Sequence, residues 1–170
     1  MTTNARNLGI AQQAITYVES KMTIGADNKW SDKFASLFAA ETSGSCVARI
    51  RKSPYPSPRL EQLREMARRA LIAGCGNCGE QAAIAFFWLH DRKVAPLEYM
   101  TRTNADHAFV VIGRKLDSSF DKPLEWGEDC IICDPWAGKV YTIRNVSKKM
   151  YGSGPFDPRT VYRFEPEEGQ

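Results

Sequence analysis

Apolar positions at helical spacing mark the first part of the chain. Residues 7–22, "NLGIAQQAITYVESKM", carry a row of apolar side chains three or four positions apart: Leu8, Ala11, Ala14, Ile15 and Val18. Residues 30–40, "WSDKFASLFAA", form a second, shorter amphipathic segment with Ser31 as its N-cap. We therefore expect a helical N-terminal portion over residues 1–56.

Residues typical of helix ends predict the next helix. The stretch "SPYPSP" breaks any regular element, and Ser57 followed by Pro58 is a typical start, an N-cap with proline in the first turn. The residues after it, "RLEQLREMARRALIA", repeat apolar side chains at helical spacing, and Gly74 is a natural stop. The pattern predicts a helix over residues 59–73.

The longest apolar run lies in "CGEQAAIAFFWLHDR", where residues 82–89 are apolar on nearly all sides. A helix of this kind is buried on most of its surface. After it come short runs typical of strands, "LEYMTR", "HAFVVIG", "DCIIC" and "GKVYTI", the last two joined by the turn-like "DPWAG". The polar, proline-containing residues 114–128 are expected to lie outside the core.

Together these elements predict one α+β domain over residues 1–170. Its helical portion would span residues 1–56 and its core residues 57–165, with an antiparallel sheet packed on the buried central helix. A chain of 170 residues with 43% apolar side chains is long enough for one core of this kind.

Charge and targeting signals limit the partners and the cellular location that we expect for the chain. The net charge is +3, but both signs are mixed along the chain, which favours a solvated basic face over a nucleic-acid surface. No apolar run approaches the roughly 20 residues of a membrane span, and the N-terminus lacks a Sec-type signal. We expect a soluble chain made in the cytoplasm.

The five cysteines allow more than one chemistry. Without a secretory signal we expect them to be reduced thiols. The pairs Cys75/Cys78 and Cys130/Cys133 leave open a zinc-stabilised binding or adaptor module as the alternative function. Two observations weaken it: the pairs are far apart, and on a strand the two cysteines of "CIIC" would point to opposite faces. A thioredoxin-type pair would need a βαβ context that the pattern lacks.

The remaining possibility is a cysteine nucleophile. Cys78 stands at the start of the buried helix, where free N–H groups and the helix dipole favour a thiolate. Cys75, just before it, is a rival. His90 would lie about 18 Å away at the far end of the same helix and cannot be the base. His107 opens a strand and Asp134 ends another, although each has a structural alternative, a packed histidine and a turn residue.

Three segments, "GNCGEQA", "DHAFVVIG" and "ICDPWAGKVY", resemble the catalytic blocks of the papain-like and transglutaminase-like cysteine hydrolase superfamily. The resemblance is greatest to small catalytic domains of bacterial effectors and toxins, which include protein deamidases and effector proteases. It covers about residues 74–141 and implies a papain-like fold with Cys78 as nucleophile, His107 as general base and acid, and Asp134 as the group that orients the imidazole.

The resemblance further implies a protein substrate, such as a host protein, attacked at a carboxamide or peptide carbonyl without a metal or cofactor. It implies synthesis in a bacterial cytoplasm and export by a specialised system. Papain places a glutamine before its cysteine as an oxyanion donor, and this chain has none there. Apart from the backbone N–H of Cys78, the candidate donors are Asn77, Gln81 and Trp136. Trp136 and Tyr141 could also line a substrate site or simply pack in the hairpin.

Overall fold

The computed structural model describes residues 3–27, 41–103, 105–146 and 157–165. The helices in these ranges are α1 (Thr3–Lys21), α3 (Ser43–Arg51), α4 (Arg59–Ala73) and α5 (Cys78–His90), with short 3₁₀ turns η1 (Pro123–Glu125) and η2 (Ile143–Asn145). The strands are β1 (Leu97–Arg102), β2 (Ala108–Ile112), β3 (Ile131–Asp134), β4 (Lys139–Thr142) and β5 (Pro158–Phe164). The predicted α+β class is confirmed.

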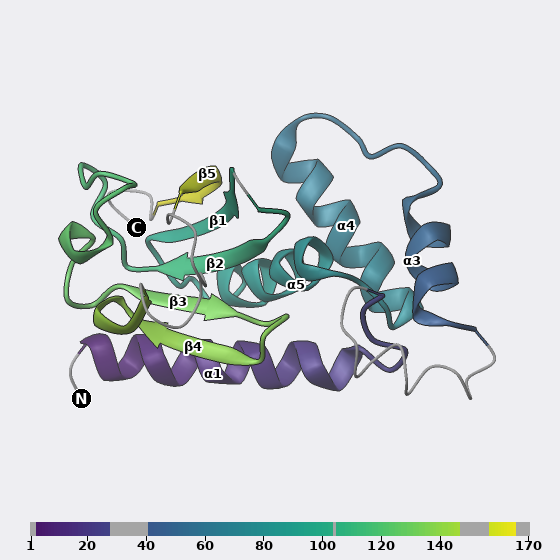
Figure 1. Ribbon diagram of the computed structural model, residues 1–170, viewed down its shortest axis with the longest axis horizontal. Coiled ribbons are helices and arrows are strands. Elements are labelled where there is room, and N and C mark those ends of the chain that lie inside the picture. The colour runs from purple at the N-terminus through teal and green to yellow at the C-terminus, as the bar shows by residue number, and fades with distance from the viewer. Residues whose placement is uncertain (1–2, 28–40, 104, 147–156, 166–170) are drawn as a thin grey trace.

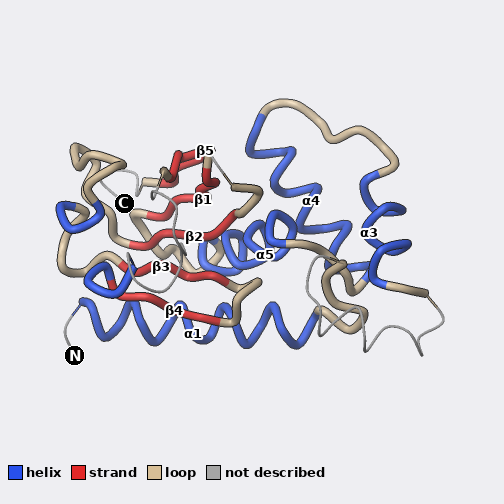
Figure 2. The backbone as a smooth tube through the Cα atoms, in the orientation of Figure 1, coloured by secondary structure: helices blue, strands red, loops and turns tan. Residues whose placement is uncertain are grey.

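The five strands form one sheet in the order β4-β3-β2-β1-β5, and every neighbouring pair is antiparallel. The predicted hairpin of "CIIC" and "GKVYTI" is present as β3 and β4. β5 was not predicted, because "PRTVYRF" mixes charged and apolar side chains at an edge of the sheet. α1 runs along the sheet beside β3 and β4, and α5 packs on β1 and β2 (Figures 1 and 2).

Alternating side chains divide the sheet between two apolar clusters. Tyr99, Val110 and Cys133 face the helices and join the main core with α1, α4 and α5. Their neighbours Phe109 and Ile132 point the other way, into a smaller cluster with Trp126 from the long β2–β3 connection. The buried helix α5 therefore packs against one face of the sheet, and the smaller cluster covers the opposite face.

The ends of α4 match the prediction in part. Gly74 caps the helix in the left-handed conformation, with φ +71°. At the other end the expectation is wrong: Pro58 itself is the N-cap residue, and no side chain caps the helix. The short segment with Ser31 as N-cap lies outside the described residues.

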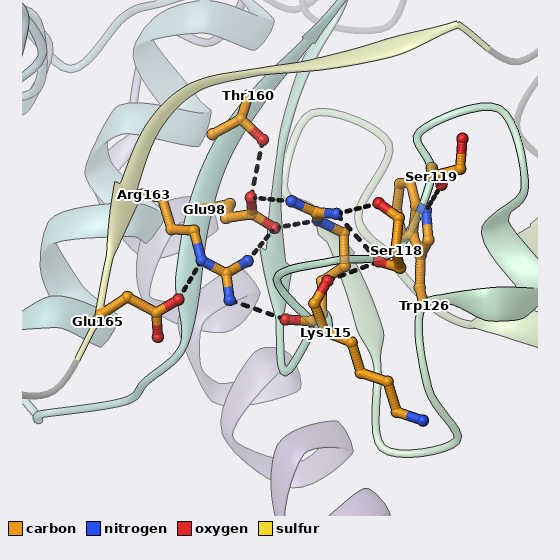
Figure 3. A network of polar contacts seen from close by, with 9 residues as sticks. Glu98, Lys115, Ser118, Ser119, Trp126, Thr160, Arg163 and Glu165 are labelled. Carbon is orange, nitrogen blue, oxygen red and sulfur yellow. Dashed lines mark hydrogen bonds and ion pairs between the residues drawn. The ribbon is translucent and has the colours of Figure 1, made fainter.

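A buried carboxylate ties β5 to the rest of the sheet. Glu98 in β1 is 1% exposed, and its carboxylate accepts hydrogen bonds from Nε and Nη2 of Arg114 at 2.7 and 2.9 Å. Arg163 and Thr160 reach the same carboxylate from β5, at 3.1 and 2.7 Å (Figure 3). This network also holds the start of the β2–β3 connection, where Arg114 donates to the Ser118 carbonyl at 2.9 Å.

The expectation of reduced cysteines is wrong for one pair. Cys46 of α3 and Cys75, just before α5, form a disulfide, and both are fully buried. The two sulfurs are 29 positions apart in sequence, so only the packing of α3 against the α4–α5 connection reveals the pairing. No helix in the described ranges is both long and apolar enough to cross a membrane.

Candidate active site

Cys78 is the first residue of α5, and the connection just before it is held by a neighbouring backbone segment. Gly25 forms a bridge with Cys75, and the Gly76 N–H donates to the Gly25 carbonyl at 3.1 Å. A side chain at position 76 would not fit, because its Cβ would lie 2.6 Å from the Cβ of Glu80. Gly76 therefore permits the tight approach of this connection to the first turn of α5.

Glu80 fastens the same turn from inside the helix. Its carboxylate accepts the backbone N–H of Asn77, the N-cap residue, at 3.0 Å. It also accepts hydrogen bonds from Nε and Nη2 of Arg51 in α3 at 2.7 Å each, and Glu80 is 1% exposed. This ion pair raises the pKa of Arg51 and keeps α3 against the start of α5.

The predicted base and orienting group are in direct contact. His107 lies immediately before β2, and its Nε2 is 2.8 Å from Oδ2 of Asp134, the last residue of β3. The other oxygen of Asp134 accepts the N–H of Ala137 at 3.0 Å, so the turn after β3 fixes the carboxylate. Trp136 stands edge-on to the imidazole, with 5.6 Å between ring centroids. Asp134 is thus both a turn residue and the partner of His107.

The imidazole also interacts with Cys78. Burial is the largest influence on its pKa and lowers it, but hydrogen bonds with Asp134 and Cys78 together outweigh burial and raise the pKa of His107 to about 9. Since Nε2 contacts Asp134, the other ring nitrogen is left for the thiol. The structure therefore brings Cys78, His107 and Asp134 together.

A cavity of about 230 Å³ opens beside these side chains. Cys78 and His107 line it together with Met66, Tyr99, Thr101 and Asp106. Cys78 is 5% exposed, and its thiol points at the backbone carbonyl of Asp106 at 3.6 Å. A larger cavity of about 700 Å³ lies near η2 and contains none of the three, so its size does not identify it as the reactive site.

The three candidate oxyanion donors have different surroundings. Asn77 lines the cavity, and its side-chain oxygen accepts the N–H of Asp27 at 3.0 Å. The amide nitrogen of Gln81 donates to the Gly76 carbonyl at 2.8 Å inside the protein, which makes it a support of the loop. Trp136 packs on His107. The backbone N–H of Cys78 and the side-chain amide nitrogen of Asn77 thus remain the best-placed of these groups, since the backbone N–H of Asn77 already donates to Glu80.

The remaining cysteines do not converge on a metal site. Cys75 is held in the disulfide, which also removes it as a rival nucleophile. Cys130 and Cys133 belong to the two different apolar clusters, on opposite faces of the sheet as predicted. Burial raises the pKa of the Cys130 thiol to about 12, and burial also raises the pKa of the Cys133 thiol. Within the described ranges no three His, Cys, Asp or Glu side chains are grouped to hold a metal.

His90 and Tyr141 lie away from the site. His90 ends α5 and packs against Phe164 of β5, with ring centroids 4.4 Å apart. Tyr141 is buried in the smaller cluster on the outer face of the sheet and does not line the cavity.

Sequence reasoning missed several groups around the site. Arg51, Tyr99 and the carbonyl of Asp106 come from three separate segments that only the fold brings to Cys78. A further contact at the site, that of Asn77 with Glu80, had a local signal in the sequence, because Asn followed three residues later by Glu is the pattern of a capping box. The ion pair of Glu80 with Arg51 had none.

No model of a known protein family matches this chain, and neither do the curated proteins or the solved structures with which it was compared.

Proposed function

We propose that this chain is a cysteine-dependent hydrolase of the papain-like type, with Cys78 as nucleophile, His107 as general base and acid, and Asp134 as the orienting group. The observation that carries this proposal is the 2.8 Å contact of His107 with Asp134, on a ring that also bonds a cysteine at a helix start. The motif resemblance and the adjoining cavity support the same roles.

The chemistry follows from these positions. The Cys78 thiolate attacks the carbonyl carbon of an amide, and the S–C bond forms as the first-turn N–H of Cys78 stabilises the oxyanion. The C–N bond then breaks, and the leaving nitrogen takes the proton of His107. Water gives a proton to His107 and its oxygen attacks the thioester carbon, the S–C bond breaks, and the carboxylic acid leaves with the Cys78 thiolate and the protonated His107 restored. The balance is amide plus water to acid plus ammonia or amine.

The substrate of this reaction is a protein. The same thioester serves deamidation of glutamine or asparagine side chains, peptide cleavage or, with an amine in place of water, transglutamination. The cavity of about 230 Å³ is smaller than the roughly 300–1,000 Å³ of sites for drug-sized ligands, which favours entry of one side chain. The resemblance to effector and toxin domains favours a bacterial protein that modifies a host protein.

Mass spectrometry of target proteins tests this proposal. Candidate targets incubated with the wild type should show an amide-to-acid mass gain, fragments or crosslinks, and each outcome names one of the three reactions. The Cys78→Ala variant should be inactive, while Cys130→Ala, a buried cysteine on the other face of the sheet, should retain activity. Activity that survives in Cys78→Ala would refute the assignment.

A further inference from the structure

Tyr99 is a buried polar side chain beside Cys78 that the proposed reaction does not use. It lies in the middle of β1 on the helix-facing side, is 3% exposed, and lines the cavity together with Cys78 and His107. Burial, followed by the negative charges of Cys78 and Glu80, raises the pKa of Tyr99. The phenol is therefore neutral and carries a single hydrogen.

That hydrogen is already committed. The Tyr99 hydroxyl donates to the backbone carbonyl of Gly79 at 3.2 Å. What remains on the oxygen is acceptor capacity, so the hydroxyl can receive an N–H but has no second hydrogen to give. Gly79 has no side chain, and a Cβ there would lie 3.5 Å from the hydroxyl oxygen. The glycine leaves the space beside the hydroxyl unfilled.

We propose that Tyr99 is a specificity-determining residue that accepts an N–H from the substrate's amide and thereby selects carboxamides over esters of the same shape. The proposal rests on the proposed function, because it concerns the group held next to the Cys78 sulfur. An ester oxygen has no hydrogen to donate, so it leaves the buried hydroxyl oxygen of Tyr99 without a hydrogen-bond donor. A primary carboxamide has two hydrogens and satisfies it.

Matched alkylating probes test this without knowledge of the protein target. Chloroacetamide and methyl chloroacetate are close in size, and both alkylate thiols, but only the amide carries N–H groups. The measured quantity is the ratio of their rate constants toward Cys78, followed by peptide mass spectrometry and divided by the same ratio for glutathione. This division removes the intrinsic reactivity of the two probes.

The wild type should prefer chloroacetamide, and Tyr99→Phe should lower the normalised ratio about tenfold, the effect of one lost hydrogen bond. Tyr141→Phe removes the same hydroxyl from a buried tyrosine on the outer face of the sheet and should leave the ratio unchanged. A change of overall packing would slow both probes together and would not move the ratio.

Three results would overturn the assignment. The first is a ratio in Tyr99→Phe within twofold of the wild type, and the second is an equal fall in Tyr141→Phe. The third is a fall in Thr101→Val alone, which would move the role to the other hydroxyl of the cavity. A Cys78 that reacts no faster in the native protein than in the unfolded chain would instead refute the proposed function.

Discussion

The carboxylate of Asp134 has two oxygen atoms with different partners. One contacts His107 at 2.8 Å and the other accepts the Ala137 N–H at 3.0 Å. Asp134→Asn keeps the shape and the turn contact but removes the charge. We expect kcat to fall by a factor on the order of 10²–10⁴, because the imidazole loses the group that orients it and stabilises its charged form. Steady-state kinetics on the modified protein target measures this fall.

The control for this change is Asp117→Asn, an exposed aspartate of the β2–β3 connection. It should leave kcat unchanged. A variant Asp134→Asn that retains kcat within threefold of the wild type would reduce Asp134 to a residue of the hairpin turn.

The raised pKa of His107 links stability to pH. In the unfolded chain the ring has an ordinary pKa near 6.5, and in the folded protein it rises to about 9 through its bonds with Asp134 and Cys78. The resulting stabilisation is complete below about pH 6.5 and is lost as the pH rises through about 9. It amounts to about 3 kcal/mol at most. Urea unfolding of wild type and His107→Gln at several pH values measures it.

The two stability curves should approach each other between pH 6.5 and 9. If the difference between wild type and His107→Gln is constant over that interval, the pKa of His107 is not raised on folding.

Single residues differ in how well the sequence predicts their place. Cys78 could be placed because a glycine-rich stretch runs into an apolar helix, a local pattern. His107 followed because the only other histidine stands at the far end of that helix. Tyr99 could not be predicted, because its neighbours in sequence form an ordinary strand and its hydroxyl partner, the Gly79 carbonyl, belongs to another element.

The start of α5 depends on a charge pair between two helices. Glu80 is 1% exposed in its side chain, whereas Arg51 is 46% exposed. Arg51→Met would leave a buried carboxylate without its cation, and we expect a loss of about 2–3 kcal/mol, less than for a fully buried pair because water reaches Arg51. Glu80→Gln in the same chain should recover most of this loss. Urea unfolding of the two single variants and the double variant gives the coupling.

Arg49→Met provides the matched control, since Arg49 pairs with Glu41 at the surface near the end of the same helix. It should lower the free energy of unfolding much less than Arg51→Met does, because both partners of this pair are exposed to water. Equal losses for Arg49→Met and Arg51→Met would mean that the burial of Glu80 contributes nothing.

The strands show what local patterns can and cannot predict. "CIIC" was placed correctly, with its cysteines on opposite faces, because alternation is a property of the strand alone. β5 was missed because its place is fixed by distant partners: Arg163 and Thr160 reach Glu98 in β1. A strand of mixed polarity is stabilised by such contacts, which the order of its residues does not reveal.

The disulfide joins the helical N-terminal part to the core next to the candidate nucleophile. Cys46 and Cys75 are 29 positions apart, and a bridge of this loop length contributes about 3–4 kcal/mol through the restriction of the unfolded chain. The free energy of unfolding should therefore fall by this amount when urea denaturation is carried out with a thiol reductant. The double variant Cys46→Ala/Cys75→Ala serves as the control, because its stability should not respond to reductant.

The lack of a secretory signal predicted reduced thiols, and this prediction is wrong for Cys46 and Cys75. Compartment rules describe the surroundings of a chain, whereas the pairing of Cys46 with Cys75 depends on α3 lying against the α4–α5 connection. The class of fold could be inferred from periodicity, but contacts between elements distant in sequence could not.

The number of reactive thiols also reports whether the protein is folded and whether its disulfide is formed. Only the thiol of Cys78 borders the cavity of the candidate site, while the other two free thiols are buried in the clusters on either side of the sheet. A colorimetric thiol reagent should therefore detect one group in the native protein, three after unfolding, and five after unfolding with reduction. Thiol counts under these three conditions thus show whether a preparation is folded, oxidised and open at Cys78.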